Sequence, residues 1–484
     1  MRPHFTSQFI NRGYSTFPYR LDVEEAHSLT SLLRFYNPIG GPIRKVALQL
    51  SPMGALPMAV AHSAFYDIDH VLRAVAPNVS ATTSHVSSVP GGGKGATPFS
   101  AFISAMGEAV ERGVGMLEFF HLDSIRGTFE QLTRQGYHCL SPNEMPLFSA
   151  DQYEQPHFMY RPFGENTVLT WILGRRLLSH QEIWVPAQLV ALYFNPHPDE
   201  EKIGYSTSGG LTCHVSYERA VLHGVCELIE RDAINLCWYL DIPPKHVQIT
   251  KVPSNGTLNA TWEAMRELPK DFYVLYHSLD MPEIPVITVI TIDSWFNRLS
   301  FNAGGGAAID GQEALLKALN EYGQSEASTR MALFAPRRPM GTNVRLMCDA
   351  DPNASKEAIN QFIQAVGYYG YPQNHDKLTS YLRDGADIAL TALPNVSGSW
   401  SAQFVHLRNI LQRYHLDPIV FDLTAEERSH VTLVKVFIPE LTQPFVQARP
   451  MFGHPRFFHI ASRFGHNQSS QSSLHFTEDP LPYP

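Results

Sequence analysis

The chain has 484 residues, of which 44% are hydrophobic and 17% charged, a composition typical of a folded, enzyme-sized protein with room for more than one domain. Its formal net charge of −9 argues against nucleic acid or a membrane surface as the main partner, and the sequence contains no run of about 18 apolar residues that could span a bilayer. The cysteine count is odd, with no CxxC pair, which indicates reduced thiols and a cytoplasmic protein.

The first informative stretch is glycine-rich, at Gly91–Ala96, and we expect it to be a turn that feeds a helix. A Ser/Thr/Val run at Ala81–Val89 predicts a strand before it. Thr97 is a suitable N-cap and Pro98 suits the first helical position, so we expect a helix to about residue 120. Polar residues spaced i, i+4, i+7 and i+8 share one face of this otherwise apolar helix: Ser104, Glu108, Glu111 and Arg112.

The middle of the chain predicts strands followed by a second helix. Apolar segments at Val168–Leu173 and Ile183–Leu192 are typical of strands. Ser216 is a possible N-cap for a helix that runs to about residue 240, where two prolines forbid continuation. This helix carries Glu227 and Glu230 among apolar residues, so it resembles the first helix in placing carboxylates on a core element.

Two buried strands and a third helix follow. Phe272–Tyr276 and Ile284–Ile292 are β-branched or aromatic runs that predict strands. A helix begins at Asp310, and Glu313 completes a capping-box pattern. Lys317, Glu321 and Gln324 repeat the i, i+4, i+7 spacing of the first helix. Beyond it we expect a further helix and a further strand, at Lys356–Val366 and Val431–Ile438.

Each of these features also has an ordinary structural explanation. The glycine segment fits the short dinucleotide pattern GxGxxA, but equally fits a plain turn before a helix. On any single helix the glutamates could form structural ion pairs at the surface. Three capped, apolar helices that all carry clustered glutamates favour a metal–nucleotide site instead, because Mg²⁺ prefers oxygen ligands and neutralises a triphosphate.

Several motifs together resemble the YcaO family of ATP-dependent peptide-modifying enzymes. They are GGKGAT, SAMGEAVER, STSGGLT, RAVLHGVCELIERDA and FNAGGGAAIDGQEALLKALNEYGQSEAS, in that order between about residues 80 and 440. The resemblance implies a mixed α+β (α/β) fold of the YcaO type, with sheets flanked by helices and an ATP site formed by several helices. It also implies a catalytic domain over 76–484, preceded by a segment of unknown role at 1–75.

The resemblance implies that the chain binds ATP and Mg²⁺. The residues that it assigns to this site are Lys94, Ser104, Glu108, Glu111, Arg112, Glu227, Glu230, Arg231, Glu321 and Gln324. Within this set the expected metal ligands are the five glutamates: Glu108, Glu111, Glu227, Glu230 and Glu321.

The chain closes on a PxPxP pattern formed by Pro480, Pro482 and Pro484. Alone, such a tail is a stiff polyproline segment that suits a partner domain. Family members with this ending resemble azoline-forming cyclodehydratases, which implies a catalytic role for the three prolines, with the Pro484 carboxylate acting as a base or orienting one. Alternatives are thioamide or amidine formation, and a non-catalytic scaffold for peptide and partner.

The implied reaction is ATP-dependent cyclodehydration of Cys, Ser or Thr residues in a ribosomally made precursor peptide. The products would be thiazoline and oxazoline rings, as in the biosynthesis of thiazole/oxazole-modified microcins and other bacteriocins. The implied partners are the peptide, a separate leader-peptide-binding protein and a flavin-dependent dehydrogenase. We expect a homodimer or a hetero-oligomer, and neither nucleic acid nor membrane as a partner.

Overall fold

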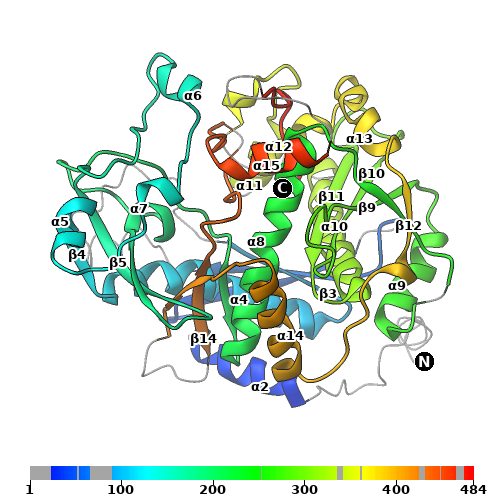
Figure 1. The fold of residues 1–484 in the computed structure, drawn as a ribbon. Helices are drawn as coiled ribbons and strands as arrows, with labels where there is room; N and C mark the ends of the chain where they lie inside the picture. The colour runs from blue at the N-terminus through cyan, green and yellow to red at the C-terminus, as the bar shows by residue number, and fades with distance from the viewer. Residues whose placement is uncertain are drawn as a thin grey trace.

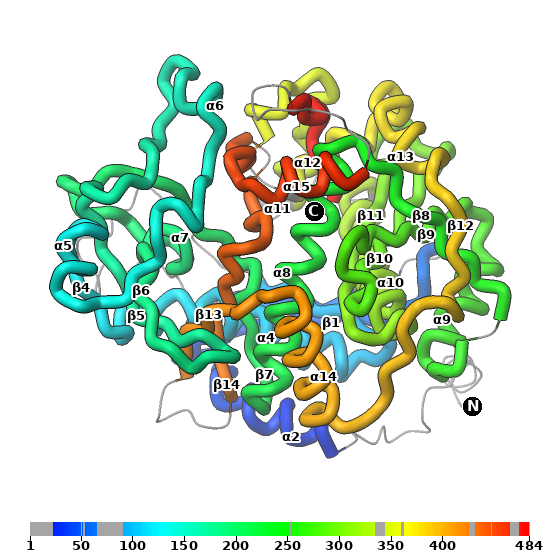
Figure 2. The backbone as a smooth tube through the Cα atoms, in the orientation of Figure 1, coloured from blue at the N-terminus to red at the C-terminus, as the bar shows by residue number. Residues whose placement is uncertain are grey.

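The computed structural model describes residues 23–51, 54–65, 90–251, 253–334, 342–359, 362–424, 431–446, 448–464 and 474–483. These ranges form a mixed α+β fold of three sheets and surrounding helices, which confirms the expected fold class (Figures 1 and 2). Pro484 and the strand expected over Ala81–Val89 lie outside the described residues. None of the helices within these ranges is both long and apolar enough to cross a membrane.

The first sheet has three antiparallel strands in the order β1-β2-β3: β1 (Ile43–Leu50), β2 (Ala59–Phe65) and β3 (Pro90–Gly95). The turn expected over the glycine segment is therefore wrong, because β3 pairs with β2 from Ala59 opposite Gly95 to Ala64 opposite Pro90. Two strands from the expected N-terminal segment thus share one sheet with a strand of the expected catalytic domain.

The glycines of β3 allow a helix to lie directly on the strand. Helix α4 (Pro98–Glu118) crosses β3 so closely that a β-carbon on Gly91 or Gly93 would overlap the helix backbone at Ala105 or Ala101. Only a residue without a side chain fits such an approach. Glycine here therefore reflects strand–helix contact and not a turn.

The second sheet repeats this arrangement. Its strand order is β11-β10-β9-β8-β12, formed by β8 (Lys245–Gln248), β9 (Phe272–Tyr276), β10 (Val286–Ile292), β11 (Phe301–Ala307) and β12 (Asp387–Ala389). Helix α10 (Gly311–Phe334) packs on β11, where β-carbons on Gly304 and Gly306 would overlap its backbone. The pair β3–α4 and the pair β11–α10 are thus built alike.

The third sheet has six strands. Its order is β4-β5-β13-β14-β7 with β6 on β5, formed by β4 (Ser124–Gly127), β5 (Leu169–Arg176), β6 (Glu182–Pro186), β7 (Leu211–His214), β13 (Ile419–Asp422) and β14 (Thr432–Phe437). The strands expected near Val168 and Val431 are confirmed as β5 and β14.

Helix α8 (Tyr217–Tyr239) runs through the middle of the molecule, against β7 and β14 of the third sheet and β10 and β11 of the second (Figure 1). The expected caps are confirmed: the side chains of Thr97, Ser216 and Asp310 each accept a backbone N–H at the start of their helix. The remaining α-helices are α2 (Val23–Leu32), α5 (Phe129–Arg134), α6 (Ala150–Glu154), α7 (Ala187–Val190), α9 (Gly256–Arg266), α11 (Thr342–Cys348), α12 (Phe362–Tyr369), α13 (Thr379–Arg383), α14 (Trp400–Arg413) and α15 (Pro455–Arg463).

Two expected elements differ from the structure. The strand expected over Ile183–Leu192 ends at Pro186, and α7 follows directly. The helix expected over Lys356–Val366 is a short 3₁₀ turn, Lys356–Ala358, and the helix α12 begins only at Phe362. Between them Ile359 is extended and only 2% exposed, so a buried, non-helical residue separates the two elements.

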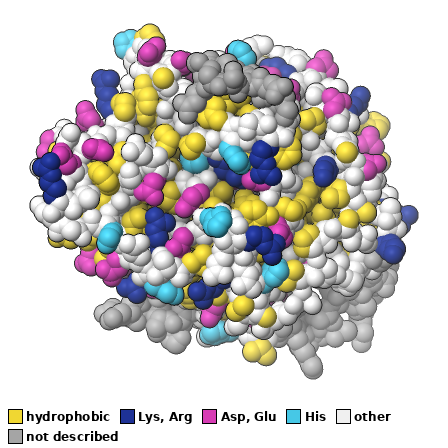
Figure 3. All heavy atoms as spheres, viewed as in Figure 1, with side chains coloured by type: hydrophobic (Ala, Val, Ile, Leu, Met, Phe, Trp, Pro, Cys, Tyr) yellow, Lys and Arg dark blue, Asp and Glu magenta, His cyan; other side chains and the backbone are white. Residues whose placement is uncertain are grey.

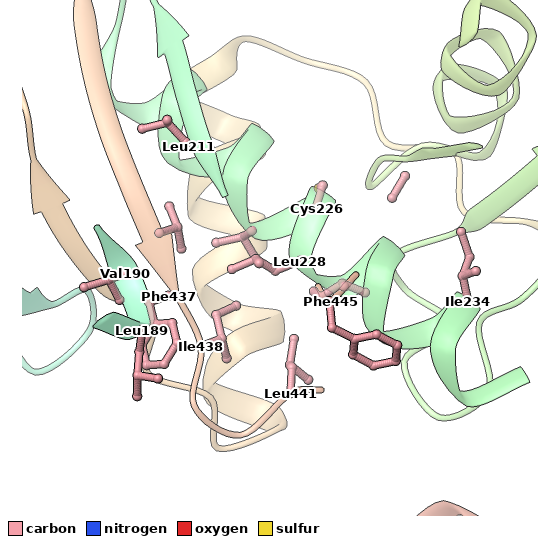
Figure 4. Close-up of a cluster of buried hydrophobic side chains, with 14 of the residues drawn as sticks. Leu189, Val190, Leu211, Cys226, Leu228, Ile234, Phe437, Ile438, Leu441 and Phe445 are labelled. Atoms are coloured by element: carbon pink, nitrogen blue, oxygen red, sulfur yellow. The ribbon is translucent and has the colours of Figure 1, made fainter. Parts of the chain in front are cut away.

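The main hydrophobic core joins α8 to the third sheet. Figure 4 shows buried side chains of this core from α7, β7, α8, the end of β14 and the segment after it: Leu189, Val190, Leu211, Cys226, Leu228, Ile234, Phe437, Ile438, Leu441 and Phe445. All five cysteines are free thiols, as the sequence predicted.

Candidate functional site

The first and third of the predicted helices hold their glutamates in the same way. The backbone N–H of Gly92 on β3 donates to Oε2 of Glu108 on α4, at 2.7 Å. The backbone N–H of Gly305 on β11 donates to Oε2 of Glu321 on α10, at 3.1 Å. In both pairs the glutamate lies 16 residues after the glycine. Each strand therefore orients one carboxylate of the helix that packs on it.

Helix α8 uses a related contact. The backbone N–H of Gly210, just before β7, donates to Oε2 of Glu227 at 3.0 Å. The strand β7 also contacts the first helix, because the N–H of Cys213 donates to Oε1 of Glu111 at 2.8 Å. A backbone donor from a neighbouring strand or loop thus fixes four of the five predicted glutamates, which limits their rotation.

Side chains cross-link β3 to α10. The Nζ of Lys94 lies 3.2 Å from Oε1 of Glu321, with both side chains about a quarter exposed. The amide of Gln324 lies against Gly92, where it leaves no room for a β-carbon. The strand of the first strand–helix pair therefore contacts the helix of the second through two side chains.

Helix α8 completes the cluster. Glu230 is 6% exposed, and a β-carbon on Gly305 would lie 2.9 Å from its Oε1. Its carboxylate therefore lies against the same glycine that donates to Glu321. Arg231 is 3.5 Å from Glu230, and Arg112 pairs with Glu108 at 2.5 Å. Of the predicted nucleotide contacts, Ser104 is half-buried one turn before Glu108 on α4.

Burial, with a smaller contribution from neighbouring carboxylates, raises the proton affinity of two of these glutamates. Burial raises the pKa of Glu111 to about 8, and the charges of Glu108 and Glu227 add to this effect. Burial also raises the pKa of Glu230 to about 7, although Arg231 opposes it. A cation that binds near such carboxyl groups stabilises their ionised form. This property is expected of a metal site before the metal binds.

Glu321 behaves in the opposite way. Burial works against its ionisation, but the charges of Lys94 and Arg231 together keep the pKa of its carboxyl below the ordinary value. The five glutamates are matched by only three cations in the set, namely Lys94, Arg112 and Arg231. When all five carboxyl groups are ionised, the predicted site would carry surplus negative charge, which a divalent cation would offset.

The glutamates do not all converge on one point. Among the described residues, no three His, Cys, Asp or Glu side chains form a group that would hold a metal ion by themselves. Such a spread suits Mg²⁺, which usually takes one or two carboxylates and completes its shell with water and phosphate oxygens. The donor set thus fits Mg²⁺ bound together with a nucleotide better than a closed metal cage.

The C-terminal tail packs onto the sheet that carries part of this site. Tyr483 is 2% exposed, and its hydroxyl lies 2.8 Å from Oγ1 of Thr288 and 3.3 Å from the hydroxyl of Tyr381. Thr288 on β10 is directly opposite Gly305 on β11, and opposite residues of an antiparallel pair face the same side of the sheet. The tail and Glu230 therefore approach the same face.

Further contacts fix the tail before Tyr483. The hydroxyl of Tyr369 donates to the carbonyl of Pro480 at 2.5 Å, and the indole N–H of Trp238 donates to the carbonyl of Asp479 at 3.0 Å. Pro480 and Pro482 are buried, so the described part of the PxPxP pattern is a packed segment and not a free ligand for a partner.

Several residues around the cluster were not predicted from the sequence. The Nε2 of His214 on β7 lies 3.3 Å from Nδ1 of His223 on α8, and Lys435 on β14 binds the loop before β7. On the face shown in Figure 3, acidic, basic and histidine side chains are mixed with hydrophobic ones, and the described residues there form no broad basic patch.

Comparison with protein families gives one match. A family model described as YcaO cyclodehydratase, ATP- and Mg²⁺-binding, matches residues 92–442. The predicted cofactors, ATP and Mg²⁺, agree with that description. An uncharacterised protein of Rhizobium leguminosarum bv. trifolii, in the tfuA 3′ region, is 32% identical over 59% of this chain. The chain spans 66% of that protein and 57% of a second uncharacterised relative, from Methanothermobacter thermautotrophicus.

Solved structures share the fold at low sequence identity. A heterocyclase in complex with substrate and cofactor aligns over 98% of this chain and 60% of its own, with a TM-score of 0.71 and 19% identity. YcaO from Methanopyrus kandleri, bound with AMPPCP and Mg²⁺, aligns over 88% and 92% (TM-score 0.58, 17% identity). The E. coli microcin synthetase McbBCD complex with pro-MccB17 bound aligns over 93% and 98% (TM-score 0.54, 14% identity).

Proposed function

Because the chain belongs to the YcaO family, we propose that it is an ATP-dependent peptide cyclodehydratase that forms azoline rings. The observation that carries the proposal is a set of contacts with the glycine strands. Glu108 contacts Gly92 of β3, and both Glu230 and Glu321 contact Gly305 of β11. These contacts support a site to which three helices contribute carboxylates, as a bound Mg²⁺–nucleotide would require.

The proposed reaction starts at a Cys, Ser or Thr side chain of a precursor peptide. Its sulfur or oxygen gives up its proton to a base and bonds to the carbonyl carbon of the preceding amide. The carbonyl oxygen thereby becomes an oxyanion, which takes the γ-phosphoryl group of ATP and releases ADP. The amide nitrogen then forms a double bond to carbon, loses its proton and expels phosphate. Phosphorylation is the step that makes the amide oxygen a leaving group.

The residues of this chain have distinct parts in the proposal. Carboxylates at Glu108, Glu111, Glu227, Glu230 and Glu321 would hold Mg²⁺, which neutralises charge on the phosphates when bound. The cations of Lys94, Arg112 and Arg231 would contact phosphate or hold the carboxylates in place. Ser104 and Gln324, on the same helix faces as Glu108 and Glu321, would contact the nucleotide.

We assign the tail with Pro480, Pro482 and Pro484 to the reacting end of the peptide. The support for this role is the contact of Tyr483 with Thr288, on the face that Glu230 also approaches. A packed segment loses little conformational entropy when the transition state forms. The tail would thus position the reacting groups, while the glutamates serve the nucleotide.

Partner proteins complete the proposal. We propose that a separate protein binds the leader of the precursor peptide, and that a flavin-dependent dehydrogenase oxidises azolines to azoles. The support is that the structurally similar microcin synthetase is a complex with pro-MccB17 bound.

The decisive experiment combines the purified chain, ATP, Mg²⁺, and a Cys-rich peptide and accessory proteins encoded beside its gene. We expect ADP release together with the mass loss of one water per ring. Replacement of an amide oxygen by sulfur, which raises the peptide mass, would instead identify thioamide formation. Peptide binding without ADP release or any mass change would identify a scaffold.

A further inference from the structure

Lys435 is a lysine in the interior of the third sheet. It lies on β14, between Leu211 of β7 and Phe421 of β13, and is only 4% exposed. Burying an ammonium group is costly unless hydrogen bonds replace its water shell. Burial accordingly lowers the pKa of Lys435 to about 8, against the opposing charge of Glu227.

The hydrogen bonds of Lys435 go to one loop. Its Nζ donates to the carbonyl oxygens of Thr207 at 2.8 Å and Gly209 at 2.6 Å. Both belong to the glycine-rich segment before β7, and the next residue, Gly210, donates its N–H to Glu227. Lys435 is therefore separated from a predicted metal ligand by a single loop.

The loop has little freedom to adjust on its own. Gly210 has φ of +77°, a conformation that side chains disfavour, and its carbonyl accepts the N–H of Val436 at 2.8 Å. A β-carbon on Gly209 would lie 2.5 Å from the ring of Pro444. The loop is thus held by β14 on one side and by Pro444 on the other, and Lys435 supplies two of its anchoring hydrogen bonds.

We propose that Lys435 is a positioning residue of the carboxylate site, which fixes the 206–210 loop so that the Gly210 N–H holds Glu227 toward Mg²⁺–ATP. This role rests on the proposed function. If Lys435 had only a structural role, its hydrogen bonds to these two carbonyls would contribute to stability. Its replacement would then leave nucleotide affinity unchanged.

The test measures Mg²⁺–ATP affinity by calorimetry and stability by urea unfolding in Lys435→Met. Methionine keeps the chain length and removes the donors, so we expect the dissociation constant to rise about tenfold or more, the effect of losing a hydrogen bond. The matched control is Lys270→Met, because Lys270 is also buried but pairs with Glu326, outside the predicted site. The control should lose stability without losing affinity.

A second variant reaches the same loop without removing a charge. Gly209→Ala forces the loop away from Pro444 and should weaken Mg²⁺–ATP binding in the same way, so it decides the question if Lys435→Met does not fold. Unchanged affinity in the folded variants, or an equal loss in Lys270→Met, would overturn the role of Lys435. A wild-type chain that binds no Mg²⁺–ATP would overturn the proposed function, and this role with it.

Discussion

The Nζ of Lys94 on β3 lies 3.2 Å from Oε1 of Glu321 on α10, an ion pair between residues 227 positions apart in the chain. This contact brings together two strand–helix pairs that are built alike. Each pair alone offers one carboxylate oriented by a glycine N–H. Joined, they place Glu321 beside Lys94 of the other pair, an arrangement that suits the proposed site for a metal and a phosphate.

Glu321→Gln should therefore reduce Mg²⁺–ATP affinity about tenfold to a hundredfold, the range for a lost hydrogen bond to a charged group. The substitution keeps the shape but removes the charge that Lys94 and Arg231 stabilise. Calorimetry measures the change. Glu313→Gln is the matched control on the same helix, since Glu313 pairs with Lys317 at 3.3 Å, and should bind as the wild type does. Equal affinity in both variants would remove Glu321 from the site.

Gly304→Ala should destabilise the protein by about 1–3 kcal/mol or more, because the added methyl group overlaps the backbone of α10 at Tyr322. Gly107→Ala is the opposite case. A β-carbon there meets nothing within 4 Å, so alanine should stabilise α4 by about 0.5–1 kcal/mol. Urea unfolding of both variants checks the pair. A tolerated Gly304→Ala would contradict the close strand–helix approach.

The helices and their glutamates were predictable because their signals are local. Thr97 and Ser216 cap their helices through contacts three residues away, and apolar spacing marks the rest. The glycine strand β3 was not predictable in this way. Glycine runs usually mark turns, and the reason for glycine here is the backbone of α4, which a reading of residues 91–95 alone does not contain.

The tail shows the same limit. The PxPxP pattern predicts a role for the prolines. One of the contacts that anchor the tail is instead made by the side chain of Tyr483, whose partner Thr288 lies 195 positions earlier. No local pattern predicts such a pair. Lys435 was not predicted for a similar reason, since a lone lysine in an apolar strand does not indicate which loop it binds.

Tyr483→Phe should lower the rate of ring formation several-fold while Mg²⁺–ATP affinity stays unchanged. The variant removes the hydroxyl that contacts Thr288 and Tyr381, which loosens the tail but leaves the glutamates in place. Single-turnover kinetics and calorimetry separate the two effects. Tyr137→Phe, at a tyrosine that is 38% exposed, is the control. A parallel loss of nucleotide affinity would indicate that the tail serves the metal site instead.

Acid should destabilise the fold through its buried histidines. Burial lowers the pKa of His454, which is 4% exposed, to about 4, and that of fully buried His277 to about 3. In the unfolded chain the pKa of histidine is about 6.5. Between these values the unfolded state binds more protons, so stability falls as the pH decreases, by up to about 1.4 kcal/mol per pH unit for each histidine.

His454→Asn isolates one of these contributions. Nδ1 of His454 accepts the N–H of Arg456 as the N-cap of α15, and asparagine is a favoured N-cap that keeps this role without titrating. Glutamates with raised pKa values oppose the trend in the wild type, but they are common to both proteins and cancel in the difference. Urea unfolding at pH values from 4.5 to 7 should therefore show a shallower decline in the variant. Parallel curves would mean that His454 does not titrate on unfolding in this range.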